Sequence, residues 1–174
     1  MGSEMCIRDR DIYVQMIRAL GANATPIPFG EVYQALVQGL VDGAENNFPS
    51  YEGTRHFEAA QFYSLTRHVM APEVLVASGK SWDKMGVEER QFLQEGAERS
   101  VPFMRAQWDA RVENARHRVA AAGANIVEDL DQDAFEKAMN PVWERFVVSP
   151  KMESLVDQIK RVYPAQPVEA SSND

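Results

Sequence analysis

An almost unbroken helical pattern from about Val87 to Ala122 constrains this chain more than any other feature. A helix of that length reaches roughly 50 Å at about 1.5 Å per residue, which exceeds the span of one small lobe. The pattern therefore predicts a strut that crosses between two lobes, with a two-helix hairpin broken near Pro102 as the alternative. Apolar side chains recur every three or four residues and form one predicted stripe, made of Val101, Met104, Trp108, Val112, Ala115 and Val119.

The residues before this helix alternate between extended and helical patterns. Helical spacing covers residues 12–20, where Gly21 follows as a C-cap, and a second helix begins at Phe29. Because strands and helices alternate, we expect an α/β fold whose parallel or mixed sheet is covered on both faces. The predicted strands are residues 24–28, 44–47, 62–66 and 74–78, and the last has the dense apolar pattern of a buried strand.

The rest of the chain completes the predicted organisation. After Gly123 we expect a strand at 124–127, a helix through Phe146 that bends near Pro141, and a final helix that ends at Val162. The opening MGSEMCIRDR has neither the pattern of a secretory signal nor that of a structural element. The predicted division is a non-native leader at 1–10, part of a ligand-binding α/β lobe at 11–86, the long helix and C-terminal helices at 87–163, and a disordered tail at 164–174.

Composition and motifs exclude several functions. A net charge of -8 argues against a nucleic-acid partner, and the single cysteine, Cys6, allows no internal disulfide. The histidines, His56, His68 and His117, lack metal-ligand spacing, and we expect His117 to lie on a solvated helix face. The acidic run at 129–133 lacks the glycine and glutamate of a calcium loop, so Asp131 or Asp133 is expected to cap a helix. We predict neither a metal nor a cofactor, and no catalytic motif is present.

The segment 41–47, VDGAENN, is the most informative polar stretch. It places Glu45, Asn46 and Asn47 where a short strand enters a loop. Ligands of α/β sheets bind outside the carboxyl ends of strands, and an asparagine amide can both donate to and accept from a carboxylate or a sugar hydroxyl. Alone, this pattern also fits a simple polar turn.

Three blocks in residues 20–76 carry a resemblance to a known family: G-A-x-x-T-P-x-x-F-x-E-V-Y-x-A-L at 21–36, V-D-G-x-E-N at 41–46 and L-T-x-H at 65–68. Together they resemble the C-terminal half of solute-binding proteins of TRAP transporters, the DctP family. The resemblance implies a type II periplasmic binding protein, truncated here, in which the long helix spans both lobes. It also implies a non-enzymatic periplasmic protein that delivers a small organic acid to the membrane subunits of the transporter.

The same resemblance suggests ligand-binding residues. Asn46 matches the asparagine that bonds the ligand, and Phe29 matches an aromatic residue of the pocket. Glu73 occupies a position whose side chain, in relatives, can reach the polar end of the ligand. Glu45, Asn47 and His68 lie in the motif blocks, where His68 is expected to bond a neighbouring backbone group. The segments E-N-N-F-P-S-Y-E and R-H-V-M-A-P-E resemble the branch of this family that is associated with sugar acids. Because a carboxylate only accepts hydrogen bonds, Glu73 favours a uronate over a dicarboxylate.

One departure from the family pattern is serious. The arginine that pairs with the ligand carboxylate belongs near Cys6, and Arg8 and Arg10 are out of register. With the first lobe also missing, we expect this chain alone to bind its ligand weakly. Two other functions stay open: a carbohydrate-acting enzyme with Glu45 and Glu73 as a carboxylate pair, and a helical interaction module. The exposed stripe of a truncated chain is also expected to cause self-association.

Overall fold

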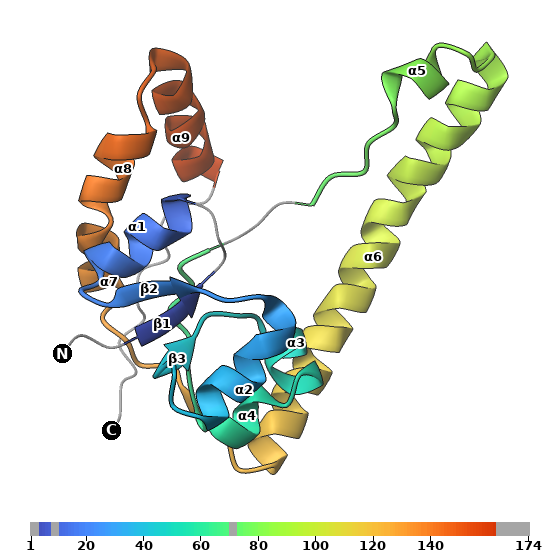
Figure 1. The fold of residues 1–174 in the computed structure, drawn as a ribbon. Coiled ribbons are helices and arrows are strands. Elements are labelled where there is room, and N and C mark those ends of the chain that lie inside the picture. Colours follow the sequence, from blue (N-terminus) through green and yellow to red (C-terminus); the bar gives the residue numbers. More distant parts are fainter. Residues whose placement is uncertain (1–3, 8–10, 70–72, 163–174) are drawn as a thin grey trace, which may run out of the picture.

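The computed structural model describes residues 4–7, 11–69 and 73–162. Its body contains a small central sheet with helices on either side, and one long helix projects from the body (Figure 1). The α/β prediction is therefore confirmed. The helices are α1 Asp11–Ala19, the 3-10 helix η1 Phe29–Glu31, α2 Val32–Val37, α3 Phe48–Gly53, α4 His56–Ala59, α5 Gly79–Trp82, α6 Val87–Ala121, α7 Gln132–Ala138, α8 Asn140–Phe146 and α9 Pro150–Val162.

The central sheet has three parallel strands in the order β2-β1-β3, with β1 at Glu4–Ile7, β2 at Asn23–Pro26 and β3 at Gly43–Ala44. The expectation that residues 1–10 contain no structural element is wrong for 4–7. These residues form the middle strand, because their main-chain groups pair with a strand on each side. Local side-chain pattern carries little information about such long-range pairing.

Both faces of this sheet are covered, as predicted. Cys6 packs with Val32 and Ala35 of α2, whereas the neighbouring Met5 packs against Met16 and Ile17 of α1. Successive side chains of a strand point to opposite faces, so one strand supplies both cores. On the α1 side, Met139 joins the cluster and α8 lies against α1.

A second sheet pairs β4, Phe62–Ser64, with β5, Asn125–Val127, in parallel. Both strands were predicted. The strand predicted at 74–78 is wrong: these residues form no strand, and Val74, Leu75 and Val76 are each 79% exposed. An apolar run becomes a buried strand only beside a partner strand, and no described segment pairs with this one.

Helix α6 confirms the predicted long helix. It runs for 35 residues with Pro102 inside it, so the hairpin alternative is wrong. Its C-terminal part packs on α3 through a core of Phe48, Tyr51, Ala115 and Val119. Among the described helices, none is long and apolar enough to cross a membrane.

The predicted helix ends are also observed. Gly21 and Gly123 follow α1 and α6 with φ of 82° and 95°, a left-handed conformation that glycine adopts without strain. Asp131 caps α7 by accepting a hydrogen bond of 2.9 Å from the Ala134 amide. The helix predicted to bend near Pro141 is divided into α7 and α8 at Met139, because proline is favoured in the first turn of a new helix. The predicted disordered tail at 164–174 lies outside the described residues.

Candidate ligand-binding cleft

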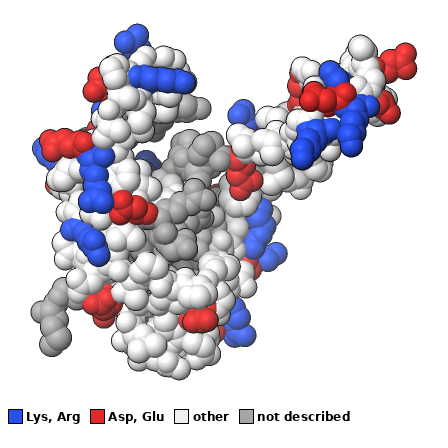
Figure 2. Space-filling model, turned by 45° about the horizontal axis from the view of Figure 1, so that its top comes forward, with Lys and Arg blue, Asp and Glu red and all other residues white. Residues whose placement is uncertain are grey.

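A cleft of about 1970 Å³ opens above the carboxyl ends of β3 and β4, between α1 and residues 100–109 of α6. Its position is the one at which α/β sheets bind ligands. The volume exceeds the roughly 300–1,000 Å³ of a small-molecule pocket, because the cleft lies open between two arms of the molecule. Figure 2 shows the projecting arm standing apart from the rest of the molecule, with charged groups of both signs at its outer end.

The strand predicted at 44–47 ends already at Ala44, so Glu45, Asn46 and Asn47 lie in the loop after β3, and all three line this cleft. Its backbone is held on two sides: the Glu45 amide donates to the Cys6 carbonyl at 3.4 Å, and the Tyr63 hydroxyl donates to the Asn46 carbonyl at 2.7 Å. The Asn46 side-chain carbonyl accepts from the Asn47 amide at 2.9 Å. No described residue bonds the Asn46 amide nitrogen, which leaves it as a donor for a ligand.

Asn47 has a structural role within the same loop. Its side-chain oxygen accepts from the Ser50 amide at 2.9 Å and so caps α3. The residue also lines the cleft. Its carbonyl oxygen thus serves the helix cap, while its amide nitrogen can donate to a ligand.

Tyr63 fixes the loop from the side of β4. Its ring stacks on Phe48 with 4.2 Å between centroids and lies 4.8 Å from the ring of Tyr51. Burial in this aromatic cluster, followed by the nearby Tyr51 and Glu45, raises the pKa of Tyr63 to about 12. The hydroxyl therefore stays protonated near neutral pH and keeps donating to Asn46.

His68 lines the cleft, and its contacts with the described residues are to side chains instead of the backbone group that we expected. Its Nδ1 lies 2.5 Å from the Thr66 hydroxyl, and its Nε2 lies 3.7 Å from the Glu45 carboxylate. The two side chains are only 24% and 15% exposed. The residue between Thr66 and His68, Arg67, has a φ of 48°, which costs a non-glycine residue roughly 1–2 kcal/mol.

The two remaining predicted residues differ. Glu73 lines the cleft. Phe29 does not: it is 53% exposed and its ring meets the His56 ring edge-on at 6.2 Å. The structure thus brings five of the six predicted residues together and leaves Phe29 out. Its position at the first residue of η1 turns it toward α4, and the sequence pattern contained no information about that turn.

Several cleft residues were not predicted. Arg105 and Trp108 of α6 and Arg67 of the β4 loop line it, and the two guanidinium groups suit a carboxylate. Trp108 was assigned to a packing stripe, and the helix periodicity could not show that its face borders a cleft. Cys6, near which the family arginine was expected, is buried against α2; Arg8 and Arg10 lie outside the described residues.

His56 also lines the cleft and is only 3% exposed. No described residue bonds its Nε2, and burial lowers the pKa of the imidazole, which favours the neutral form. Three or more metal-binding side chains do not gather anywhere in the described part of the chain. The polar side chains that the structure describes in the cleft carry carboxylates, amides, imidazoles, guanidinium groups and hydroxyls, a set that suits an organic acid with hydroxyl groups.

Comparison with known proteins gives consistent matches. The family model described as "Bacterial extracellular solute-binding protein, family 7" (DctP) matches residues 1–149. A protein of Chromohalobacter salexigens named "Solute-binding protein" is 42% identical over 160 residues, which cover 91% of this chain and 48% of that protein. The chain therefore spans about half the length of the curated relatives that it matches.

Two solved structures have the same fold. A TRAP periplasmic solute-binding protein from a Bradyrhizobium species, in complex with galacturonate, is 48% identical with a TM-score of 0.83. The match covers 92% of this chain and 53% of that one. A second, from Chromohalobacter salexigens with bound D-glucuronate, is 42% identical with a TM-score of 0.86, covering 92% and 54%. The predicted periplasmic-binding-protein fold is confirmed.

Proposed function

The chain belongs to the DctP family of bacterial extracellular solute-binding proteins. From this premise we propose that its cleft takes part in binding a uronate, and that the uronate is released without chemical change. The observation that carries the proposal is the loop 45–47. Three polar residues lie in an open cleft at a strand end, on a backbone held by hydrogen bonds to Cys6 and Tyr63. Such a loop presents its side chains without an ordering cost at the moment of binding.

The charges of the cleft favour a uronate over a dicarboxylate. A uronate carries one carboxylate and several hydroxyl groups. Arg67, Arg105 and the Asn46 amide nitrogen can donate to the carboxylate, while Glu45 and Glu73 can accept from hydroxyl groups. A second ligand carboxylate would be repelled by those two glutamates, because like charges in a partly desolvated cleft repel each other. The solved relatives from Bradyrhizobium and Chromohalobacter hold galacturonate and glucuronate, which supports this choice.

The wider role follows from the family. We infer that the whole protein acts in the periplasm and hands the ligand to the membrane subunits of a TRAP transporter. Solute-binding relatives support this inference. A binding role requires a cleft that can close on a ligand, and the cleft volume of about 1970 Å³ in this chain agrees with an open state.

Titration of the chain with glucuronate, galacturonate and succinate, followed by two-dimensional NMR, tests the proposal. We expect uronates to shift the backbone resonances of residues 45–47, with a weak Kd of about 1 mM or above, because the chain spans only half of its relatives. Asn46→Ala should weaken binding by about tenfold, since it removes a hydrogen bond to a charged group. Asn114→Ala, on the exposed face of α6, is the matched control.

Each outcome is informative. If uronates shift no resonance near the loop, the proposed ligand class is wrong, and a preference for succinate would favour dicarboxylates instead. A micromolar Kd would contradict the expectation that this chain binds weakly. Conversion of the sugar acid to a new product would support the enzyme alternative, with Glu45 and Glu73 as the carboxylates to substitute first.

A further inference from the structure

One buried imidazole has no role in the binding loops. His56, the first residue of α4, is only 3% exposed. In the part of the chain that the structure describes, it is the one buried residue whose side chain ordinarily takes up a proton near neutral pH. Its Nε2 has no hydrogen-bond partner among those residues. The site therefore tolerates a neutral ring, whereas an imidazolium would be an unpaired charge in the interior.

The ring of Phe29 covers this imidazole from the side of η1. The two ring centroids are 6.2 Å apart and the ring planes meet at 67°. Phe29 is itself 53% exposed, so its ring lies between the imidazole and solvent. A separation of this size is at the outer limit of a cation–π contact, which extends to about 6 Å. The phenyl ring thus shields His56 from water and offers little compensation for a positive charge.

The helix that carries His56 is held in place by contacts of its neighbours. Arg55 has a φ of 60°, a left-handed conformation that a non-glycine residue adopts only where its surroundings impose it. Its guanidinium group pairs with Glu58 of α4 at 2.5 Å, and the Tyr33 hydroxyl of α2 donates to the same carboxylate at 3.0 Å. These bonds fasten α4 to α2 and turn His56 inward without using the imidazole.

No described charge is placed to neutralise an imidazolium at this position. The elements around His56 carry these acidic, basic and phenolic groups: Glu31 of η1, Tyr33 of α2, Tyr51 and Glu52 of α3, and Arg55 and Glu58 beside or within α4. Glu58 is engaged by Arg55 and Tyr33, and Glu52 by two arginines of α6. Among the described residues, no hydrogen bond or ion pair joins His56 to any of these groups. Burial accordingly lowers the pKa of His56.

We propose that Phe29, α2 and α4 form an acid-sensitive latch, which is closed while His56 is neutral and opens when the imidazole gains a proton. In the open state the Phe29 ring moves off the imidazole, and water reaches the charge. The latch adjoins the cleft, because Glu58, Ala59 and Ala60 of this segment line it. Its action does not depend on which ligand the cleft takes.

The effect of pH on stability has a definite sign. Histidine in an unfolded chain titrates near about pH 6.5, whereas the folded chain takes up the proton on His56 only at lower pH. Below about pH 6.5 the unfolded state therefore binds more protons than the folded state. The contribution of neutral His56 is fully present above that pH and is lost as pH falls toward the lower, folded-state pKa. Carboxylates ordinarily titrate further down, near about pH 4.

The first test uses the unsubstituted chain without a ligand. NMR signals of the imidazole rings should show that His56 titrates at lower pH than His117, which is exposed on α6. Backbone resonances of residues 29–33 and 55–60 should shift with the same midpoint as the His56 ring. If His56 titrates together with His117, the imidazole is not shielded. If the ring titrates while those backbone resonances stay unchanged, the latch does not open.

The second test is urea unfolding of variants at pH 8 and pH 5.5. The unfolding equilibrium constant of the unsubstituted chain should rise about fivefold more over this interval than that of His56→Gln, which cannot take up the proton. Phe29→Ala should reduce the difference, because water then reaches the imidazole in the folded chain. His117→Gln and Phe92→Ala, at exposed positions of α6, are the matched controls and should behave like the unsubstituted chain.

The outcomes separate the parts of the latch. An equal pH dependence in His56→Gln and the unsubstituted chain overturns the role of His56. An unchanged dependence in Phe29→Ala overturns the role of Phe29 as its cover. If His56→Gln does not fold, the NMR titration of the unsubstituted chain still decides whether the imidazole is held neutral and whether the latch opens.

Discussion

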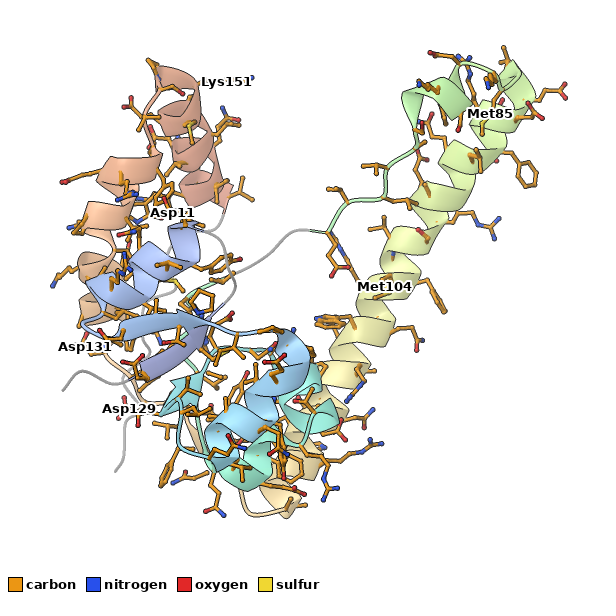
Figure 3. All side chains as sticks on the ribbon, viewed as in Figure 1. Asp11, Met85, Met104, Asp129, Asp131 and Lys151 are labelled. Atoms are coloured by element: carbon orange, nitrogen blue, oxygen red, sulfur yellow. The ribbon has the colours of Figure 1, made fainter. Side chains whose placement is uncertain are left out.

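The two parts of α6 show how one sequence pattern leads to two different environments. In the inner part, Ala115 and Val119 are fully buried against α3. In the outer part, every residue from 98 to 110 is exposed, although Val101, Met104 and Trp108 belong to the same stripe. Figure 3 shows side chains standing out from the helix around Met104 and toward Met85 at its outer end. Periodicity thus identifies the apolar face of a helix, and a partner decides whether that face is buried.

The inner part is held by both packing and charge. Arg111 donates to Glu52 of α3 at 2.5 Å and to the Pro49 carbonyl at 3.3 Å, and Arg118 reaches the same glutamate at 3.3 Å. The outer part instead has contacts within one stretch of chain, such as Gln91 to Glu95 at 2.9 Å. Contacts of this i,i+4 kind contribute only about 0.2–0.5 kcal/mol each. The outer part is therefore expected to be the less stable end.

The largest expected effect on the free energy of unfolding comes from placing a charge at a buried residue of the inner part of α6, in comparison with an exposed residue of the outer part. Val119→Asp should destabilise the chain by about 3 kcal/mol or more, because it places a charge in the core shared with α3. Val101→Asp makes the same change on the same stripe at a residue that is 48% exposed, and should change the free energy of unfolding by no more than about 0.5 kcal/mol. Urea unfolding measures both. Equal losses would show that the outer part is buried in solution.

A smaller effect should come from the ion pairs of the inner part. The hydrogen bond from Arg111, followed by that from Arg118, holds the pKa of Glu52 below its ordinary value. Its contribution to stability is therefore present above the ordinary pKa and lost as pH falls through the lower, folded-state pKa. Glu52→Gln should cost about 1 kcal/mol at neutral pH and reduce the acid-induced loss.

Urea unfolding at a series of pH values between about 7 and 3 tests this ion-pair prediction. Glu98→Gln, which removes a carboxylate whose hydrogen-bond partner among the described residues is Gln94 of the outer part, is the control. If Glu98→Gln and Glu52→Gln flatten the acid profile equally, the ion pairs with Arg111 do not distinguish the two parts.

The smallest effect on stability should come from the outer stripe. Met104→Ser with Trp108→Ser should change the free energy of unfolding by less than about 1 kcal/mol, since both residues are more than 40% exposed. The double substitution should nevertheless reduce the self-association expected of an exposed apolar face, as measured by sedimentation velocity. Phe103→Ser, beside the stripe, should leave association unchanged. Association that survives the double substitution would assign it to another surface.

Sequence reasoning reached much of the candidate site and missed part of it for identifiable reasons. The rule that ligands bind outside the carboxyl ends of strands placed Glu45, Asn46 and Asn47 in the cleft, because the local pattern shows which residues follow a strand. The family resemblance assigned Phe29 to the pocket, but Phe29 does not line the cleft, because its direction depends on the path of η1 past α4. Sequence reasoning also missed Arg105 and Trp108, because the side of α6 that borders the cleft is set by how α6 packs on α3.

The sequence by itself determined the α/β class, the length of α6, the glycine and aspartate helix ends and the loop 45–47, because each depends on neighbours close in the chain. The tertiary structure alone decided that residues 4–7 form the central strand, that Val74–Val76 stay exposed, and that Thr66, His68 and Glu45 meet. Strand pairing, burial and contacts between loops all require segments distant in sequence. Whether such segments meet is settled by the packing of the whole chain, which local propensity does not encode.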